Sequence, residues 1–144
     1  MEFEVRVRLT TNFLGSGPRK NGVRKLLRNK QGLILLPVSD LNKDIDKIRE
    51  NLSLNTDHQI TLQEDLDPPR INILRRVYNK VRVERIEGIE SKTYLSIYCH
   101  CEEDYVNELT ILFKELGKKY GISQWGRKFN CGRFKLVSIL IRKS

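Results

Sequence analysis

Hydrophobic residues recur along this chain with two different periods, and the order of those periods limits the folds open to it. Over 2–10, 77–84 and 93–99, apolar and polar residues alternate, which is typical of half-buried strands. Gly88 lies between the last two segments and predicts that they form a β-hairpin. A nearly continuous apolar run over 133–142 predicts a final strand that is buried on both faces.

Two further segments repeat their apolar residues with the spacing of a helix. Leucines and isoleucines follow one another at intervals of four, three and four residues over 41–52, and Ser39 or Asp40 is the expected N-cap. The apolar spacing over 105–116 predicts a second helix, which Gly121 is expected to terminate.

These elements run in the order strand, helix, strand, strand, helix, strand. That order predicts an α+β fold with a ferredoxin-like, or RRM-like, antiparallel sheet whose two helices cover one face. The length of 144 residues fits a single domain over 1–144. The segment at about 15–38 is then a basic insertion between the first strand and the first helix. Within it, 19–30 has the apolar spacing of a helix, and Pro37 limits the apolar run 32–38 to an edge strand or a strand end. A further short strand is expected over 60–62.

The charge of the chain points to an anionic partner. There are 27 Lys and Arg residues against 18 Asp and Glu residues, which gives a formal net charge of +9. Such a charge attracts polyanions, nucleic acid first among them, and it also suits an acidic patch on a protein. No apolar run is long enough for a membrane helix, and the acidic start of the chain is unlike a secretory signal. The three cysteines suit a reducing compartment, so we expect a cytoplasmic protein.

One face of the predicted sheet combines cations with aromatic rings. If the apolar rows of the strands face the helices, the opposite face collects Arg6, Arg8, Lys80, Arg82, Tyr94, Tyr98 and His100. Arg and Lys neutralise phosphates and aromatic rings stack on bases, so these residues form a candidate surface for single-stranded RNA or DNA. RNA-recognition domains use the same surface of this fold, although their standard aromatic motif is absent here. The alternative is a solvated sheet face, or one covered by the insertion.

Two loops extend this candidate surface. The insertion contributes Arg19, Lys20, Arg24 and Lys25, and the glycine-rich segment 121–133 contributes Arg127, Lys128 and Arg133. Because glycines permit a backbone to approach a phosphate closely, we expect these loops to bind nucleic acid beside the sheet face. The alternative is that the glycines only turn the chain while Trp125 packs in the core.

The glycine-rich segment also carries a family resemblance. Through Gly121, Trp125, Gly132, Arg133 and Phe134 it resembles the C-terminal glycine-rich loop of the RAMP superfamily, the ferredoxin-like RNA-binding proteins of CRISPR systems. The same residues are similar to a Gly-x-x-x-Trp and Gly-Arg-Phe pattern in small bacteriophage proteins. The first resemblance implies RNA binding through the glycine loop. The second implies an accessory role in infection, such as nucleic-acid metabolism or counter-defence.

Catalytic and metal-binding patterns are weak in this sequence. Cys99, His100, Cys101 and Cys131 are zinc-type ligands, but on a strand His100 points away from its two neighbours, and the usual spacing between zinc-binding cysteines is absent. The glycine-containing loop at 15–22 lacks the ending of a P-loop. We therefore expect no catalytic residue, no metal and no cofactor.

The function that these observations favour is non-enzymatic binding of single-stranded RNA or DNA. An alternative from another class is inhibition of a host defence system by protein contact, in the manner of an anti-CRISPR, where the partner is a host protein or ribonucleoprotein. A second alternative is a small metal-independent endoribonuclease that uses His100 beside Tyr98 and Lys80, which predicts that His100→Ala abolishes cleavage.

Overall fold

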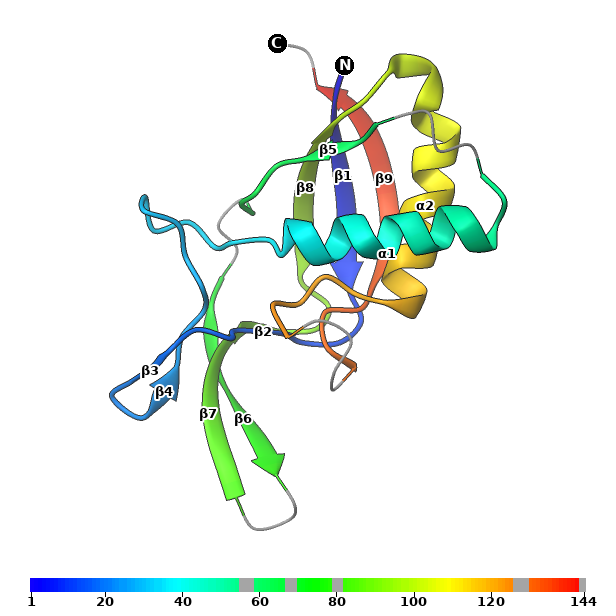
Figure 1. The fold of residues 1–144 in the computed structure, drawn as a ribbon. Helices are drawn as coiled ribbons and strands as arrows, with labels where there is room; N and C mark the ends of the chain where they lie inside the picture. The colour runs from blue at the N-terminus through cyan, green and yellow to red at the C-terminus, as the bar shows by residue number, and fades with distance from the viewer. Residues whose placement is uncertain (55–58, 67–69, 79–81, 126–129, 143–144) are drawn as a thin grey trace.

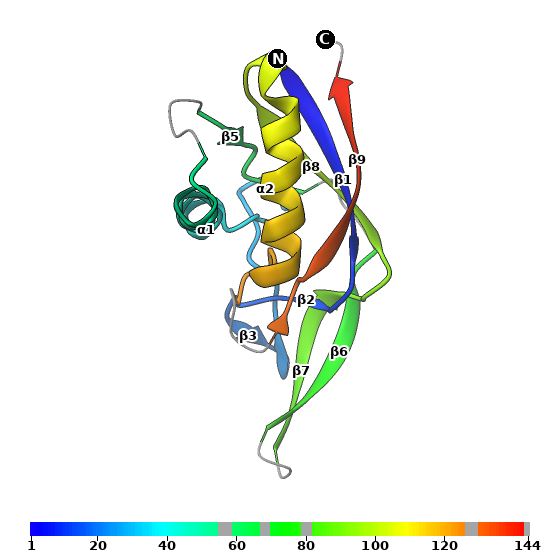
Figure 2. The ribbon, with the colours of Figure 1, turned by 90° about the vertical axis from the view of Figure 1, so that its right-hand side faces the viewer.

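The computed structural model describes residues 1–54, 59–66, 70–78, 82–125 and 130–142. These residues form an α+β structure with two helices and two sheets in which most strand pairs are antiparallel. Both helices lie on one side of a four-stranded main sheet, and the second sheet extends from its lower end (Figure 1; Figure 2). The predicted α+β class is confirmed.

The main sheet has the strand order β5-β8-β1-β9, and every neighbouring pair is antiparallel. Its strands are β1 (Glu2–Leu9), β5 (Thr61–Leu62), β8 (Tyr94–His100) and β9 (Phe134–Arg142). The strands expected over 2–10, 60–62 and 93–99 are therefore confirmed. The alternation in β1 is also as predicted, since its apolar side chains are all buried and belong to the same core cluster as apolar residues of both helices.

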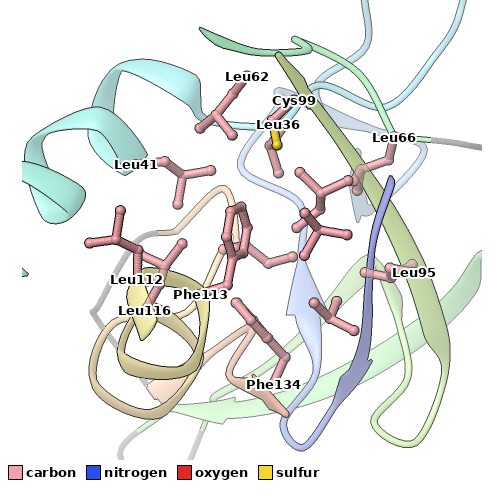
Figure 3. Packing of buried hydrophobic residues seen from close by; sticks show 14 of the residues in the cluster. Leu36, Leu41, Leu62, Leu66, Leu95, Cys99, Leu112, Phe113, Leu116 and Phe134 are labelled. Carbon is pink, nitrogen blue, oxygen red and sulfur yellow. The ribbon is translucent and has the colours of Figure 1, made fainter. Parts of the chain in front are cut away.

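The main core lies between this sheet and the two helices, α1 (Val38–Asn51) and α2 (Val106–Lys119). A 3-10 turn, η1 (Glu103–Tyr105), precedes α2. Figure 3 shows part of this core, in which Leu41 of α1 and Leu112 and Leu116 of α2 lie with Phe113 and Phe134. The helical spacing in the sequence therefore predicted both helices and the faces that they bury.

The ends of the helices agree with the sequence only in part. The predicted N-cap at Ser39 or Asp40 is wrong, because α1 begins directly after Pro37, which takes the N-cap position without a side-chain hydrogen bond. Gly121 ends α2 as predicted. Its φ is +82°, in the left-handed region that favours glycine, and its N–H donates to the carbonyl of Leu116 at 2.8 Å.

The second sheet is built on β7 (Arg82–Ile89), which pairs antiparallel with β6 (Asn72–Tyr78). β2 (Phe13–Leu14) pairs with the end of β7, β4 (Val23–Arg24) runs parallel to its middle, and β3 (Arg19–Lys20) pairs with β4. No pairing joins β7 to β8 in the described part of the chain.

The predicted hairpin between 77–84 and 93–99 is therefore wrong, because β7 pairs with β6 whereas β8 pairs with β1. Burial shows why the pattern misled. Val83 is exposed and Glu84 is buried, so the start of β7 does not turn its valine toward the main core. The strand expected over 77–84 also falls on two strands, because β6 ends at Tyr78 and β7 begins at Arg82. The hairpin of β6 and β7 extends away from the helices instead (Figure 1).

The insertion contains neither of its two predicted elements. The helix expected over 19–30 is wrong, because Asn21 and Gly22 have φ values of 54° and 76° and form the tight turn between β3 and β4. The strand expected over 32–38 is also wrong, since this part makes only isolated bridges at Ile34 and Leu35. A side chain from the glycine-rich segment holds the backbone of 32–38 in place, because the Gln124 amide donates to the Leu35 carbonyl at 2.9 Å.

The last strand is not buried on both faces, contrary to its apolar sequence. β9 lies at the edge of the main sheet, and among the described strands it pairs with β1 alone. Val137, Leu140 and Ile141 are exposed as a result. None of the helices in the described residues is long and apolar enough to cross a membrane.

Candidate nucleic-acid interface

The open face of the main sheet, opposite the helices, is crossed by rows of side chains that the strand register fixes. Arg8 stands between Tyr94 of β8 and Lys135 of β9. The next row places Arg6 between Ser96 and Ser138. Facing residues of neighbouring strands point to the same side, so these two rows gather three cations and one tyrosine. We call Arg6, Arg8, Tyr94 and Lys135 the cationic end of the open face.

Tyr94 is the exposed ring of the cationic end. Its side chain is 62% exposed, and the Arg8 guanidinium carbon lies 5.8 Å from the ring centroid. Arg6 is also exposed, and its Nε lies 3.7 Å from Glu4 Oε2. An exposed aromatic ring beside arginine and lysine side chains suits a stacked base with its phosphate held nearby.

At the other end of the open face, the charged side chains pair with groups of the protein itself. Tyr98 is only 7% exposed, its hydroxyl donates to Glu4 Oε1 at 3.2 Å, and the Arg142 guanidinium carbon lies 4.5 Å from its ring centroid. Arg142 also contacts Glu2 at 3.3 Å. Although Tyr98 lies on the predicted face, a base therefore cannot stack on its ring without displacing Arg142.

His100 lies at this same end, across from Glu2 of β1 and Thr61 of β5. It is exposed, and it follows Tyr94 by six positions along β8, a separation of about 20 Å in a strand. The open face thus brings Arg6, Arg8 and Tyr94 together and places His100 at its other end. Tyr98 lies between them, with its hydroxyl on the Glu4 carboxylate that Arg6 also contacts.

The insertion uses most of its predicted cations within the fold. Arg19 and Arg24 contact the same oxygen, Glu84 Oε1, at 2.9 Å and 2.6 Å. The guanidinium of Arg24 also lies 5.4 Å from the ring centroid of Trp125. Lys20 is exposed on β3. Arg19 and Arg24 therefore anchor the insertion to β7, which leaves less of their charge for a ligand.

A second carboxylate on β7 holds the next two cations of the insertion. Lys25 and Arg28 contact Glu87 at 3.5 Å and 3.0 Å. Burial raises the pKa of Glu87, but hydrogen bonds from Arg28 and from the Leu26 amide, together with the charges of Arg28 and Lys25, outweigh it and leave the pKa below its usual value. The carboxylate is therefore charged at neutral pH and matches the cations beside it.

The glycine-rich segment is packed tightly against its own backbone. A Cβ at Gly132 would collide with the Ser123 backbone N. Trp125 donates its indole N–H to the Gly15 carbonyl, and Arg133 caps α2 by donating to the Lys118 carbonyl at 2.8 Å. Arg127 and Lys128 lie outside the described residues. The described part of this segment thus makes close backbone contacts within the fold, and Trp125 is partly buried against a small cluster of Leu14, Ile86 and Cys131.

Of two further predicted residues, one came from a wrong sheet assignment and the other is not described. Arg82 belongs to β7 of the second sheet rather than to the open face, and only its backbone is described. Lys80 lies outside the described residues. Sequence reasoning missed Lys135, although the alternation of Phe134, Lys135 and Leu136 at the start of β9 was available as a signal.

The cysteines behave as core residues. Cys99, Cys101 and Cys131 are free and buried. Burial, followed by the charges of Cys101 and Glu2, raises the pKa of Cys99 to about 12, so Cys99 stays protonated at neutral pH. Among the residues that the structure describes, no group of three or more His, Cys, Asp or Glu side chains is placed to hold a metal ion.

No protein-family model matches the chain. A search of curated proteins also finds no match.

Proposed function

We propose that this protein binds single-stranded nucleic acid without modifying it, through the cationic end of the open face. The observation that carries the proposal is the row of Tyr94, Arg8 and Lys135 across three neighbouring strands. The exposed ring supplies a stacking surface, and the two cations beside it supply partners for phosphates. The net charge of +9 adds long-range attraction for a polyanion.

We further propose that the main sheet is of the ferredoxin-like type. Support comes from the chain order β1, α1, β5, β8, α2, β9, combined with the spatial order β5-β8-β1-β9 and two helices on one side. Under this proposal, β6 and β7 are an insertion between the second and third strands. RNA-recognition domains bind RNA on the corresponding sheet face.

The direct test is fluorescence anisotropy with labelled single-stranded RNA and DNA oligonucleotides over a series of salt concentrations. We expect binding at low salt and a linear fall of log affinity with log salt, because phosphate contacts release counterions. Comparing the affinities for the RNA and DNA oligonucleotides shows whether the protein prefers ribose or deoxyribose. Absence of binding at low salt, or an affinity that does not change with salt, would sink the proposal.

A second candidate function is inhibition of a host nucleic-acid enzyme or ribonucleoprotein by protein contact. The observation that favours it is the edge strand β9, on which Val137, Leu140 and Ile141 are exposed, since an exposed apolar strand edge is a surface on which proteins pair. Pull-down from nuclease-treated host lysate separates the two functions. A defined partner that survives nuclease and is lost in Leu140→Lys supports inhibition.

A further inference from the structure

A basic groove lies next to the cationic end. It has a volume of about 700 Å³ and is bounded by α2, the start of β9 and the residues that follow β1. Its polar lining includes Thr10, Thr11, Lys114, Lys118, Arg133 and Lys135. The volume is within the range of pockets that hold small ligands or parts of larger ones.

The charge of this groove is uncompensated, unlike that of the insertion. No Asp or Glu is among the described residues that line it. Within the described part of the chain, no carboxylate lies within 4.0 Å of the ammonium groups of Lys114, Lys118 or Lys135, whereas the neighbouring Lys119 contacts Glu115 at 2.9 Å. Like charges that converge on one hollow raise its potential and attract an anion.

Arg133 and Thr11 of the groove are also suited to an anion. Arg133 is held in place by the carbonyls of Lys118 and Lys119. The Thr11 hydroxyl accepts the Arg133 backbone N–H at 2.9 Å, which leaves its own O–H able to donate. The ring of Phe134, in contrast, is almost fully buried, so the groove offers donors for phosphate oxygens rather than a ring for a base.

Lys135 connects the groove to the open face. It lines the groove, and it also stands beside Arg8 in the row that begins at Tyr94. A strand with one base stacked on Tyr94 would therefore meet Arg8, then Lys135, and then the groove. Lys114 and Lys118 follow on the next element, one helical turn apart on α2.

We propose that this groove is the backbone channel of the protein, in which Lys114, Lys118 and Lys135 bind consecutive phosphodiester groups of the strand whose base stacks on Tyr94. The inference rests on the proposed function and deepens it. Because the donors face phosphates and not base edges, the groove contributes affinity without sequence preference.

The test compares two triple variants that remove the same charge. One carries Lys114→Gln, Lys118→Gln and Lys135→Gln. The control carries Lys30→Gln, Lys43→Gln and Lys47→Gln, which are also exposed, and Lys43 and Lys47 are spaced on α1 as Lys114 and Lys118 are on α2. Urea midpoints verify that both variants fold as the wild type does.

We expect the groove variant to reduce the slope of log affinity against log salt by about 2, because each phosphate contact on a single strand contributes about 0.7. The control should keep the wild-type slope, and Lys→Arg replacements at the three groove positions, which preserve the charge, should keep it too. Tyr94→Ala should lower the affinity at an unchanged slope.

The outcomes separate the inference from the function on which it rests. If Tyr94→Ala weakens binding but the groove and control variants have equal slopes, the channel is wrong and the proposed function stands. If the wild type binds no oligonucleotide, both are wrong. A groove variant with a reduced slope for RNA and DNA alike supports the channel, since both strands carry the same phosphodiester.

Discussion

The ion pairs of the insertion lead to a quantitative prediction about Glu84. This carboxylate is 5% exposed, and its Oε1 lies 2.6 Å from Arg24 Nε and 2.9 Å from an Arg19 terminal nitrogen. We consider the change Glu84→Gln, which keeps the shape and one acceptor oxygen but removes the charge. Two arginines then lose the carboxylate that joins β3 and β4 to β7.

The expected loss follows from the burial of each partner. Removing one member of a buried ion pair costs about 3–5 kcal/mol, but the Arg19 and Arg24 side chains are 43% and 25% exposed, so solvent replaces part of the interaction. The remaining amide oxygen preserves part of the hydrogen bonding. We expect a loss of about 2 kcal/mol in the free energy of unfolding, or about 4–8 °C in Tm for a chain of this size.

Urea unfolding followed by circular dichroism measures this difference. The matched control is Glu50→Gln, an exposed glutamate of α1, for which we expect a change within about 0.5 kcal/mol. A Glu84→Gln variant as stable as this control would refute the assignment of Arg19 and Arg24 to the fold, and would return both to the list of candidate ligand-binding residues.

Three further predictions concern pH, thiol reactivity and packing. The pKa of Glu87 is lower in the folded protein than in the unfolded chain. The Glu87 carboxylate therefore stabilises the fold fully above its unfolded-state pKa, and this stabilisation is lost as pH falls through its folded-state pKa. The difference in unfolding free energy between wild type and Glu87→Gln should therefore shrink between about pH 7 and about pH 3, and a constant difference would contradict this. Cys99, with a pKa of about 12, should react with Ellman's reagent only after unfolding, and labelling of the folded protein at Cys99 would count against its burial. Gly117→Ala should lower the urea midpoint, at a cost of about 1–3 kcal/mol, because its Cβ would collide with the Phe134 carbonyl; a midpoint raised by the better helix propensity of alanine would show that α2 and β9 separate easily.

Elements whose periodicity is local were predictable from the sequence. α1 and α2 appear where the apolar spacing places them, and β1 and β8 bury the faces that their alternation indicates. The same alternation placed Arg6, Arg8 and Tyr94 on one face, which is the basis of the candidate site.

Sheet membership was not predictable, because it depends on pairings between distant segments. The alternation near Val83 indicates a strand but not its partner, and the buried residue there is Glu84, whose burial depends on two arginines from the insertion. A local signal for the insertion was available, since Asn21-Gly22 is a strong hairpin pair.

The groove was hidden from sequence reasoning for a similar reason. Its lysines come from α2 and β9, and only the packing of that helix against the edge strand brings Lys114 and Lys118 beside Lys135. Glycines of the segment 121–133 bring backbone segments into close contact, as at Gly121 and Gly132.

The most direct test of the central claim is the dissociation constant of Tyr94 variants for a single-stranded oligonucleotide at fixed salt. Tyr94 is exposed, so neither Tyr94→Phe nor Tyr94→Ala should disturb the fold. If a base stacks on this ring, Tyr94→Ala should raise Kd about 5- to 150-fold, from a stacking energy of about 1–3 kcal/mol. Tyr94→Phe should keep the wild-type Kd. Equal Kd values for Tyr94→Ala and wild type would contradict the account.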